Sequence, residues 1–261
     1  MKTDKIKLGL PSGRTLGDPT IFYLGRGGVT INRPNKRKYV GEIYTGRPTT
    51  RPALPRQVYY ASPAEITRLV GLGKLHLGVT GLDTVLEQFE PVRTDYGSMF
   101  DEVVVKGEYK YGRAGKGEQR IVLFAKRNST EASRGNKLQP KDVVATEYPE
   151  LTRRLFADWQ VKAAIVSSRG SVEAHLHLGL ANYGVTLMER GGTLLANDFV
   201  DVLSMARTYP VIVINRAAYE ADETKSLSCV ANIIDAALRD GLEKKDQLYV
   251  PLPDHAVFSR P

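Results

Sequence analysis

Cysteine and tryptophan are almost absent from this chain of 261 residues, which has one of each. The lone cysteine, Cys229, cannot form an internal disulfide, which excludes a disulfide scaffold and favours a reducing compartment. Apolar runs are too short to span a bilayer, and the charged first residues have no apolar segment behind them. These absences predict a cytoplasmic globular protein without a membrane-bound part.

Histidine is also scarce, with four in the chain, and its spacing predicts no metal centre. His175 and His177 stand two residues apart on an expected helix, so their side chains diverge by about 200 degrees. Neither His76 nor His255 adds a spacing typical of metal ligands.

Positive charge, in contrast, is abundant and is concentrated in one segment. The net charge is +8, and residues 26–56 hold eight basic side chains against a single acid, Glu42. Prolines, glycines and tyrosines lie among these charges, so we expect a loop or hairpin rather than a helix. Such a surface attracts polyanions, either nucleotide phosphates or a nucleic acid. No nucleic-acid-binding motif accompanies it, which makes nucleic acid the weaker alternative.

Apolar runs of strand length alternate with helical patterns along the chain, which is typical of an α/β fold. Nine strands are expected, enough for two sheets: Ile6–Leu10, Gln57–Ala61, Leu75–Val79, Glu102–Val105, Arg120–Ala125, Val143–Thr146, Ala163–Val166, Val185–Met188 and Val211–Ile214. Helices are expected from Ser62 onward and over Gly81–Gln88, Pro149–Trp159, Val172–Leu180, Leu194–Ala206 and Glu220–Asp240.

The segment from Val185 to Asn197 is the most informative part of the sequence. An expected strand ends at Met188, glycines follow at 191 and 192, and a helix is expected from Thr193. Backbone N–H groups in such a turn and at a helix N-terminus bind phosphate monoesters. The same pattern also serves in many α/β proteins only to reverse the chain.

Six segments, in the same order, resemble the ATP phosphoribosyltransferase family. They are Leu10-Pro11-Ser12-Gly13-Arg14, Leu77-Gly78-Val79-Thr80-Gly81-Leu82-Asp83, Tyr111-Gly112-Arg113-Ala114, Ala145-Thr146-Glu147-Tyr148-Pro149-Glu150-Leu151-Thr152-Arg153-Arg154, Gly170-Ser171-Val172-Glu173 and Gly191-Gly192-Thr193-Leu194-Leu195-Ala196-Asn197.

The resemblance implies two α/β lobes joined by a hinge, similar to type II periplasmic binding proteins, with substrates in the cleft. We expect the first lobe over residues 1–104, completed by 208–242, the second lobe over 105–207 with the phosphate loop, and a tail over 243–261. The implied reaction joins ATP to phosphoribosyl pyrophosphate and begins histidine biosynthesis. Mg²⁺ is expected on the substrate rather than in a protein cage.

The resemblance also implies a set of site residues. The catalytic candidates are Arg14, Arg113 and Glu173. The substrate-binding candidates are Gly13, Thr80, Gly81, Asp83, Thr186, Glu189, Arg190, Gly191, Gly192, Thr193 and Leu194. With only a short segment after the last expected helix, the chain resembles the family's short form, which implies a regulatory partner similar to histidyl-tRNA synthetase and a homo-oligomer.

The chain departs from the family pattern at four positions. Thr186 stands where the family has an acid, Arg190 where it has a hydroxyl, and both Ser12 and Glu147 where it has lysine. These departures leave open a second interpretation, a diverged homologue that binds a nucleotide or phosphate ligand without transferring it, or one with an altered substrate.

Overall fold

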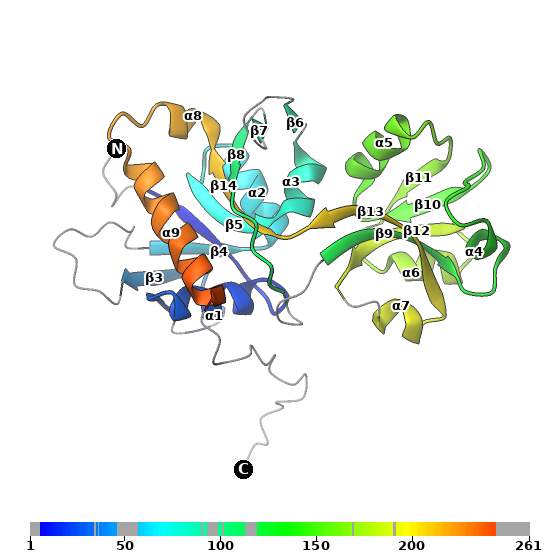
Figure 1. Ribbon diagram of the computed structural model, residues 1–261, viewed down its shortest axis with the longest axis horizontal. Helices are drawn as coiled ribbons and strands as arrows, with labels where there is room; N and C mark the ends of the chain where they lie inside the picture. Colours follow the sequence, from blue (N-terminus) through cyan, green and yellow to red (C-terminus); the bar gives the residue numbers. More distant parts are fainter. Residues whose placement is uncertain are drawn as a thin grey trace, which may run out of the picture. The chain divides into compact units, whose positions relative to one another are not determined.

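The computed structural model describes residues 6–33, 35, 37–45, 57–89, 91–92, 99–100, 102–112, 119–168, 170–189 and 192–243. Two compact units are present (Figure 1). Unit 1 comprises Met1–Gly81, Pro91–Gly117 and Pro210–Pro261, and unit 2 comprises Leu82–Glu90 and Glu118–Tyr209. The segment 82–90, expected in the first lobe, therefore belongs to unit 2.

Unit 1 is built on a nine-stranded sheet in the order β2-β3-β4-β1-β5-β14-β8-β7-β6. Its strands are β1 (Leu8–Pro11), β2 (Val29–Asn32), β3 (Val40–Thr45), β4 (Gln57–Ala61), β5 (Leu77–Gly81), β6 (Pro91–Val92), β7 (Met99–Phe100), β8 (Val103–Lys106) and β14 (Pro210–Asn215). Its helices are α1 (Gly17–Arg26), α2 (Pro63–Gly71), α8 (Arg216–Glu220) and α9 (Ser226–Glu243). Strands β4, β1 and β5 run parallel, so their carboxyl ends share one edge.

Unit 2 is built on a five-stranded sheet in the order β11-β10-β12-β9-β13. Its strands are β9 (Gln119–Lys126), β10 (Val143–Thr146), β11 (Ala164–Ser167), β12 (Tyr183–Met188) and β13 (Phe199–Thr208), and its helices are α3 (Leu82–Gln88), α4 (Thr130–Arg134), α5 (Pro149–Asp158), α6 (Val172–His177) and α7 (Gly192–Ala196). One core packs α5 against the sheet, and a second packs α6 and α7 against the other face.

Each of the nine expected strands overlaps an observed strand, and the two-lobed α/β class is confirmed. The start of α2 is also as expected, because the Ser62 hydroxyl accepts a hydrogen bond from the Glu65 N–H. The basic segment contributes the β2–β3 hairpin up to Thr45. Residues 46–56 lie outside the described residues.

The expected helix over Leu194–Ala206 is wrong. The chain forms the short helix α7, turns at Asp198 in a left-handed conformation (φ 58°), and continues as β13. Register shifts interrupt the pairing of β13 with β9 between Asp201 and Leu203 and between Ser204 and Ala206. Because each bulge adds a residue, the apolar positions of β13 lose the period of two that marks a regular strand.

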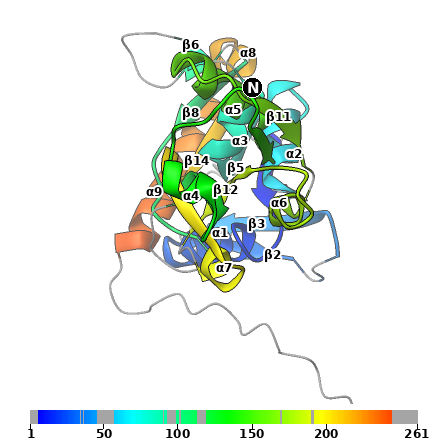
Figure 2. The ribbon, with the colours of Figure 1, turned by 90° about the vertical axis from the view of Figure 1, so that its right-hand side faces the viewer.

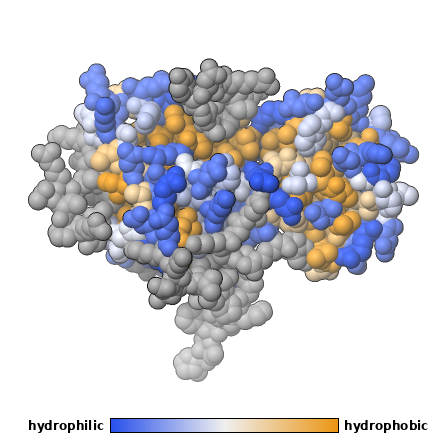
Figure 3. Space-filling view, viewed as in Figure 1, coloured by the Kyte–Doolittle hydropathy of each residue, from blue (hydrophilic) through white to orange (hydrophobic). Residues whose placement is uncertain are grey.

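On the face drawn in Figure 3, the described residues of both units show hydrophilic and hydrophobic side chains mixed together. Among the described residues, no helix combines the length and the apolar character needed to cross a membrane.

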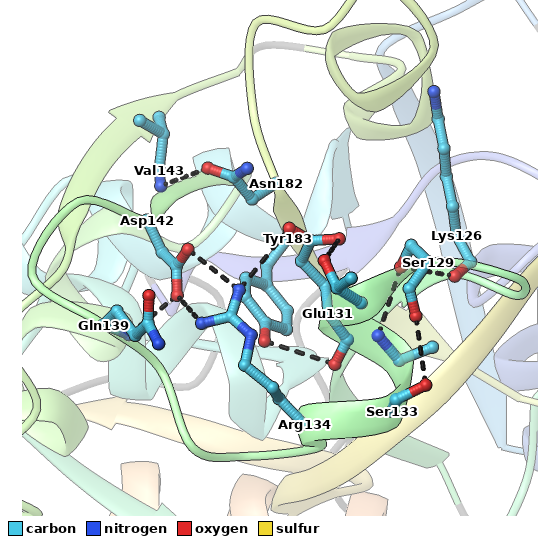
Figure 4. Close-up of polar contacts among 12 residues, drawn as sticks. Lys126, Ser129, Glu131, Ser133, Arg134, Gln139, Asp142, Val143, Asn182 and Tyr183 are labelled. Carbon is cyan, nitrogen blue, oxygen red and sulfur yellow. Dashed lines mark hydrogen bonds and ion pairs between the residues drawn. The ribbon is translucent and has the colours of Figure 1, made fainter.

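A buried carboxylate fixes the segment between α4 and β10 (Figure 4). The Asp142 side chain is 2% exposed, and the Arg134 guanidinium donates to both of its oxygens, at 2.9 and 3.1 Å. The backbone N–H of Gln139 donates to the same carboxylate, at 2.7 Å. Burial alone would raise the pKa of Asp142, but these hydrogen bonds and the Arg134 charge outweigh burial and lower it.

Replacing Arg134 with alanine leaves this carboxylate buried without its cation, and we expect a loss of about 2–3 kcal/mol in the free energy of unfolding. Urea unfolding followed by the fluorescence of Trp159, the chain's single tryptophan and a residue of unit 2, measures this loss. Because the folded pKa of Asp142 is lowered, the contribution is complete above about pH 4 and declines as the pH falls through the folded pKa.

The matched control is Arg153→Ala, which removes an exposed ion pair with Glu150 on α5. Exposed pairs of this kind contribute roughly 0–1 kcal/mol. Equal losses for the two variants would contradict the role given to Asp142.

Candidate active site

The carboxyl ends of β10 and β12 meet at one edge of the unit 2 sheet. Both strands run parallel to each other, and β11 runs parallel to β10, so the segments that follow all three emerge at this edge. They carry Glu147, Glu173 and Glu189, and also the start of α7. In α/β sheets, ligands bind beyond the carboxyl ends of the strands. The edge is therefore the candidate site of unit 2.

The buried side chain of Asp83 connects several segments at this edge. Its carboxylate accepts hydrogen bonds from the Tyr148 hydroxyl at 3.0 Å and the Thr208 hydroxyl at 3.1 Å. The residue is 7% exposed. Burial raises the pKa of Asp83, and the two hydroxyls and nearby backbone N–H groups partly oppose that rise. The structure thus places this predicted substrate-binding residue where it joins α3, the end of β13 and the segment after β10.

Glu87, one helical turn after Asp83, binds the start of α5. Its carboxylate accepts hydrogen bonds from the backbone N–H groups of Glu150, at 3.1 Å, and Leu151, at 2.9 Å. A carboxylate at a helix N-terminus satisfies backbone donors that the helix itself leaves unpaired. This contact and the Asp83 contact explain why α3 belongs to unit 2.

Two carboxylates share the outer part of the edge. Glu147 follows β10, and Glu173 lies in the first turn of α6. The pKa of Glu147 is raised, first by partial desolvation of its carboxyl group and second by the charge of Glu173. The position where the family pattern has a lysine thus carries a negative charge close to a second one.

The segment after β12 lies partly within the described residues. Thr186 pairs with Val122 of β9, which belongs to the core under α6 and α7, so Thr186 is on the α7 face of the sheet. Glu189 accepts a hydrogen bond from the Gln119 side chain, at 3.0 Å. Leu194 is buried in the same core as Val122 and anchors α7.

Five other predicted residues lie wholly or partly outside the part of the chain that the structure describes. Arg190, Gly191 and Arg113 lie outside the described residues. Gly192 and Thr193 form the first turn of α7 as backbone, as the sequence predicts for a phosphate-binding turn. Their roles, and that of Leu194, stay predictions.

In unit 1, the loop after β1 carries Gly13 and Arg14 at the carboxyl edge of the parallel strands. Gly13 has a φ of +96°, a conformation that favours glycine, and nothing lies within 4 Å of where its side chain would begin. At Gly17 a Cβ atom would lie 2.4 Å from the Pro11 carbonyl oxygen, so only glycine lets α1 begin this close to β1. Arg14 is exposed in this loop.

Thr80 and Gly81 end β5 at the same edge of unit 1. The Thr80 hydroxyl is buried, donates to the Pro63 carbonyl at 2.9 Å and lies 3.0 Å from the Thr67 hydroxyl. Gly81 pairs with Pro210 of β14. The structure gives Thr80 a part in holding the start of α2, and the predicted contact with substrate stays a prediction.

Sequence reasoning missed three residues that build the unit 2 edge: Tyr148, Thr208 and Glu87. Tyr148 lies in the segment from Ala145 to Arg154 that resembles the family, and Glu87 follows Asp83 at the spacing of one helical turn. Both residues could therefore have been found from the sequence. Thr208 carried no such signal, because its contact with Asp83 joins residues 125 positions apart.

No cluster of three or more histidine, cysteine, aspartate or glutamate side chains suited to a metal ion occurs in the part of the chain that the structure describes.

The comparisons with known proteins identify one family. A family model described as ATP phosphoribosyltransferase matches residues 62–236. An ATP phosphoribosyltransferase from Nitratidesulfovibrio vulgaris is 33% identical over 219 residues, which cover 82% of this chain and 66% of that protein. One from Variovorax paradoxus is 28% identical over 236 residues, 88% of this chain and 96% of that protein. The chain thus spans about two thirds of some relatives and nearly all of others.

Solved structures share the fold. The ATP phosphoribosyl transferase (HisG:HisZ) complex from Thermotoga maritima contains a chain that superposes with a TM-score of 0.62 at 20% identity, covering 90% of this chain and 98% of that one. A histidine kinase sensor domain described as similar to periplasmic binding proteins superposes with a TM-score of 0.51 at 12% identity, covering 90% of each chain.

The Asp83 contacts predict the behaviour of Tyr148→Phe, which removes one donor from a buried carboxylate. We expect a loss of about 1–3 kcal/mol in the free energy of unfolding at pH 7, measured by urea unfolding with Trp159 fluorescence. Because the folded pKa of Asp83 is raised, the carboxylate is ionised only above that raised value. The difference between the wild type and the variant therefore grows as the pH rises through the raised pKa of Asp83.

The control for this experiment is Tyr219→Phe, because Tyr219 is 40% exposed. A Tyr148→Phe variant as stable as this control, or a loss that grows on acidification, would show that Tyr148 does not support the Asp83 charge.

Proposed function

Because the chain belongs to the ATP phosphoribosyltransferase family, we propose that it transfers the phosphoribosyl group of phosphoribosyl pyrophosphate to N1 of ATP, the first step of histidine biosynthesis. The observation that carries this proposal is the match of the family model to residues 62–236, which include the whole carboxyl edge of the unit 2 sheet. The predicted residues Asp83, Glu173 and Glu189 lie on segments at that edge.

The reaction sets clear demands on the protein. The lone pair of adenine N1 forms a bond to C1 of the ribose, and the C1–O bond breaks with its electrons leaving on pyrophosphate. Positive charge develops on the sugar while negative charge develops on the leaving group, so fixed donors and cations near the leaving group lower the barrier. Adenine N1 is already a nucleophile, so no protein base or covalent intermediate is needed.

Unit 2 supplies the phosphate site in this proposal. Backbone N–H groups of residues 191–194 bind the 5-phosphate, with the Thr193 hydroxyl as a further donor. Thr186 lies on the α7 face of β12, which supports a place beside the ribose. Arg14 and Arg113 supply charge to the polyphosphates, with Arg190 as a third candidate.

We also propose that Mg²⁺ arrives with the pyrophosphate, where it offsets the charge of the leaving group. Among the described residues there is no cluster of three side chains suited to a metal ion, so in this proposal the substrate itself would carry the ion.

A regulatory partner belongs to the same proposal. The Thermotoga maritima structure is described as a HisG:HisZ complex, and its matching chain is covered almost completely by this one. We propose a partner of the HisZ kind, a homo-oligomeric catalytic chain and a location in the cytoplasm.

A second function is favoured by one observation. Glu147 and Glu173 repel each other at the edge that would receive pyrophosphate, which is the reverse of what a polyanion needs. A homologue that binds a less charged nucleotide or phosphate ligand without transfer accounts for this pair.

Mass spectrometry separates the two functions. The chain is incubated with MgCl₂, ATP and phosphoribosyl pyrophosphate, with and without a purified HisZ-type partner. Formation of phosphoribosyl-ATP is expected. Its absence in both mixtures, together with calorimetric binding of either substrate, would favour the binding-only homologue.

The acidic pair predicts that Glu147→Gln binds phosphoribosyl pyrophosphate more tightly. Removing one unit charge near a polyanionic ligand, at an intermediate effective dielectric, changes the binding free energy by about 1 kcal/mol, or about fivefold in Kd. Calorimetric titration at low salt measures it, with the exposed Glu220→Gln of unit 1 as control. Unchanged or weaker binding by Glu147→Gln would place the polyphosphate away from this side chain.

A further inference from the structure

The start of β9 lies beside the end of β12 in unit 2. The two strands run antiparallel, and their register ends with Met188 opposite Arg120. The residue before Arg120 is Gln119, and the residue after Met188 is Glu189. Their side chains meet, because the Gln119 amide donates a hydrogen bond to the Glu189 carboxylate, at 3.0 Å. This contact ties the first residue of β9 to the first residue after β12.

The contact lies on the α5 face of the unit 2 sheet. Helix α5 covers one face of the sheet, and α7 covers the other (Figure 2). Ile121 and Leu123 belong to the core under α5. Alternate residues of a strand share a face, so Gln119 points to the α5 face as well. The Glu189 carboxylate, which Gln119 binds, is therefore separated by the sheet from Thr186 on the α7 face.

The position of Gln119 is itself fixed by the neighbouring strand. Gln119 pairs with Thr208 of β13. The Thr208 hydroxyl donates to the Asp83 carboxylate, at 3.1 Å, and accepts a hydrogen bond from the Asp83 backbone N–H, at 2.9 Å. Gln119 is 8% exposed, so most of its contact with water is lost on folding. The hydrogen bond to Glu189 offsets that loss for one of the amide donors.

The predicted phosphate-binding turn begins directly after Glu189 and ends at Leu194. Leu194 is 4% exposed and is buried in the core under α6 and α7. The chain is thus attached to the α5 face before the turn and to the α7 face at its end. A segment that is fixed at both ends loses less conformational entropy when it binds a ligand.

We propose that Gln119 and Glu189 are positioning residues, whose mutual hydrogen bond holds the start of the phosphate-binding turn, and that the Glu189 carboxylate is not a contact of the ribose. Through this bond, the buried segments around Asp83 and Thr208 set the place of the turn. The inference rests on the proposed function, because the turn is the 5-phosphate site of that proposal.

Reversing the two side chains tests this inference. Gln119→Glu brings two carboxylates together and removes the donor. Glu189→Gln removes the charge but leaves an amide pair, which forms a weaker hydrogen bond. The double variant Gln119→Glu/Glu189→Gln again pairs one donor with one carboxylate, in the reverse order. The control is Gln160→Glu, which adds the same charge at an exposed glutamine of unit 2. Far-UV circular dichroism verifies that each full-length variant folds.

Two measurements give the result: hydrogen–deuterium exchange of the ligand-free chain, and calorimetric titration with ATP or with phosphoribosyl pyrophosphate and MgCl₂. We expect Gln119→Glu to exchange faster in peptides that cover residues 189–196 and to bind phosphoribosyl pyrophosphate about tenfold more weakly. Its Kd for ATP is unchanged, and so are all values for Gln160→Glu. The double variant recovers about threefold or more of the lost affinity and exchanges more slowly than Gln119→Glu.

A double variant that binds phosphoribosyl pyrophosphate more weakly than either single variant would overturn the inference, because the Glu189 charge would then contact the substrate. Unchanged exchange and affinity in Gln119→Glu would overturn it as well. A wild type that does not bind phosphoribosyl pyrophosphate would instead refute the proposed function, and the exchange of the ligand-free variants would still decide whether the pair holds the turn.

Discussion

The carboxylate of Asp83 is the contact on which the unit 2 edge depends. It joins the first turn of α3 to Thr208 at the end of β13 and to Tyr148 after β10. A second acid on α3, Glu87, holds the start of α5. Burial raises the pKa of both acids, and the hydrogen bonds that their carboxylates accept partly oppose that rise. The strand ends that carry the proposed chemistry are thus positioned by the carboxylates of Asp83 and Glu87, whose hydrogen bonds come from other segments of unit 2.

Much of this fold could be predicted from the sequence, because buried parallel strands read as short apolar runs. Strands β4 and β10 were predicted to the residue. Strand β13 was not, because its two bulges disturb the alternation on which such a prediction depends. Helix α1 was missed as well, because two glycines and a proline dilute its helical signal. A local sequence pattern predicts local structure, whereas a bulge depends on pairing with a strand that is distant in the sequence.

The candidate site was predictable only in part. The glycine turn at 191 and 192 and the segment from Ala145 to Arg154 carried recognisable patterns, and the structure places the start of α7 and the segment from Ala145 to Arg154 at strand ends of one sheet. The partner of Asp83 across 125 residues was invisible to the sequence, and so was the proximity of Glu147 to Glu173. That proximity gives the departure at position 147 a physical meaning, because it makes this part of the edge more negative than a polyphosphate site requires.

The central claim is that the unit 2 strand ends bind phosphoribosyl pyrophosphate. Hydrogen–deuterium exchange of the full chain, measured by mass spectrometry with and without Mg²⁺ and phosphoribosyl pyrophosphate, tests it most directly. The account predicts slower exchange in peptides that cover residues 147–148, 170–173 and 189–196. Unchanged exchange in all three, with slowing confined to other segments, would contradict it.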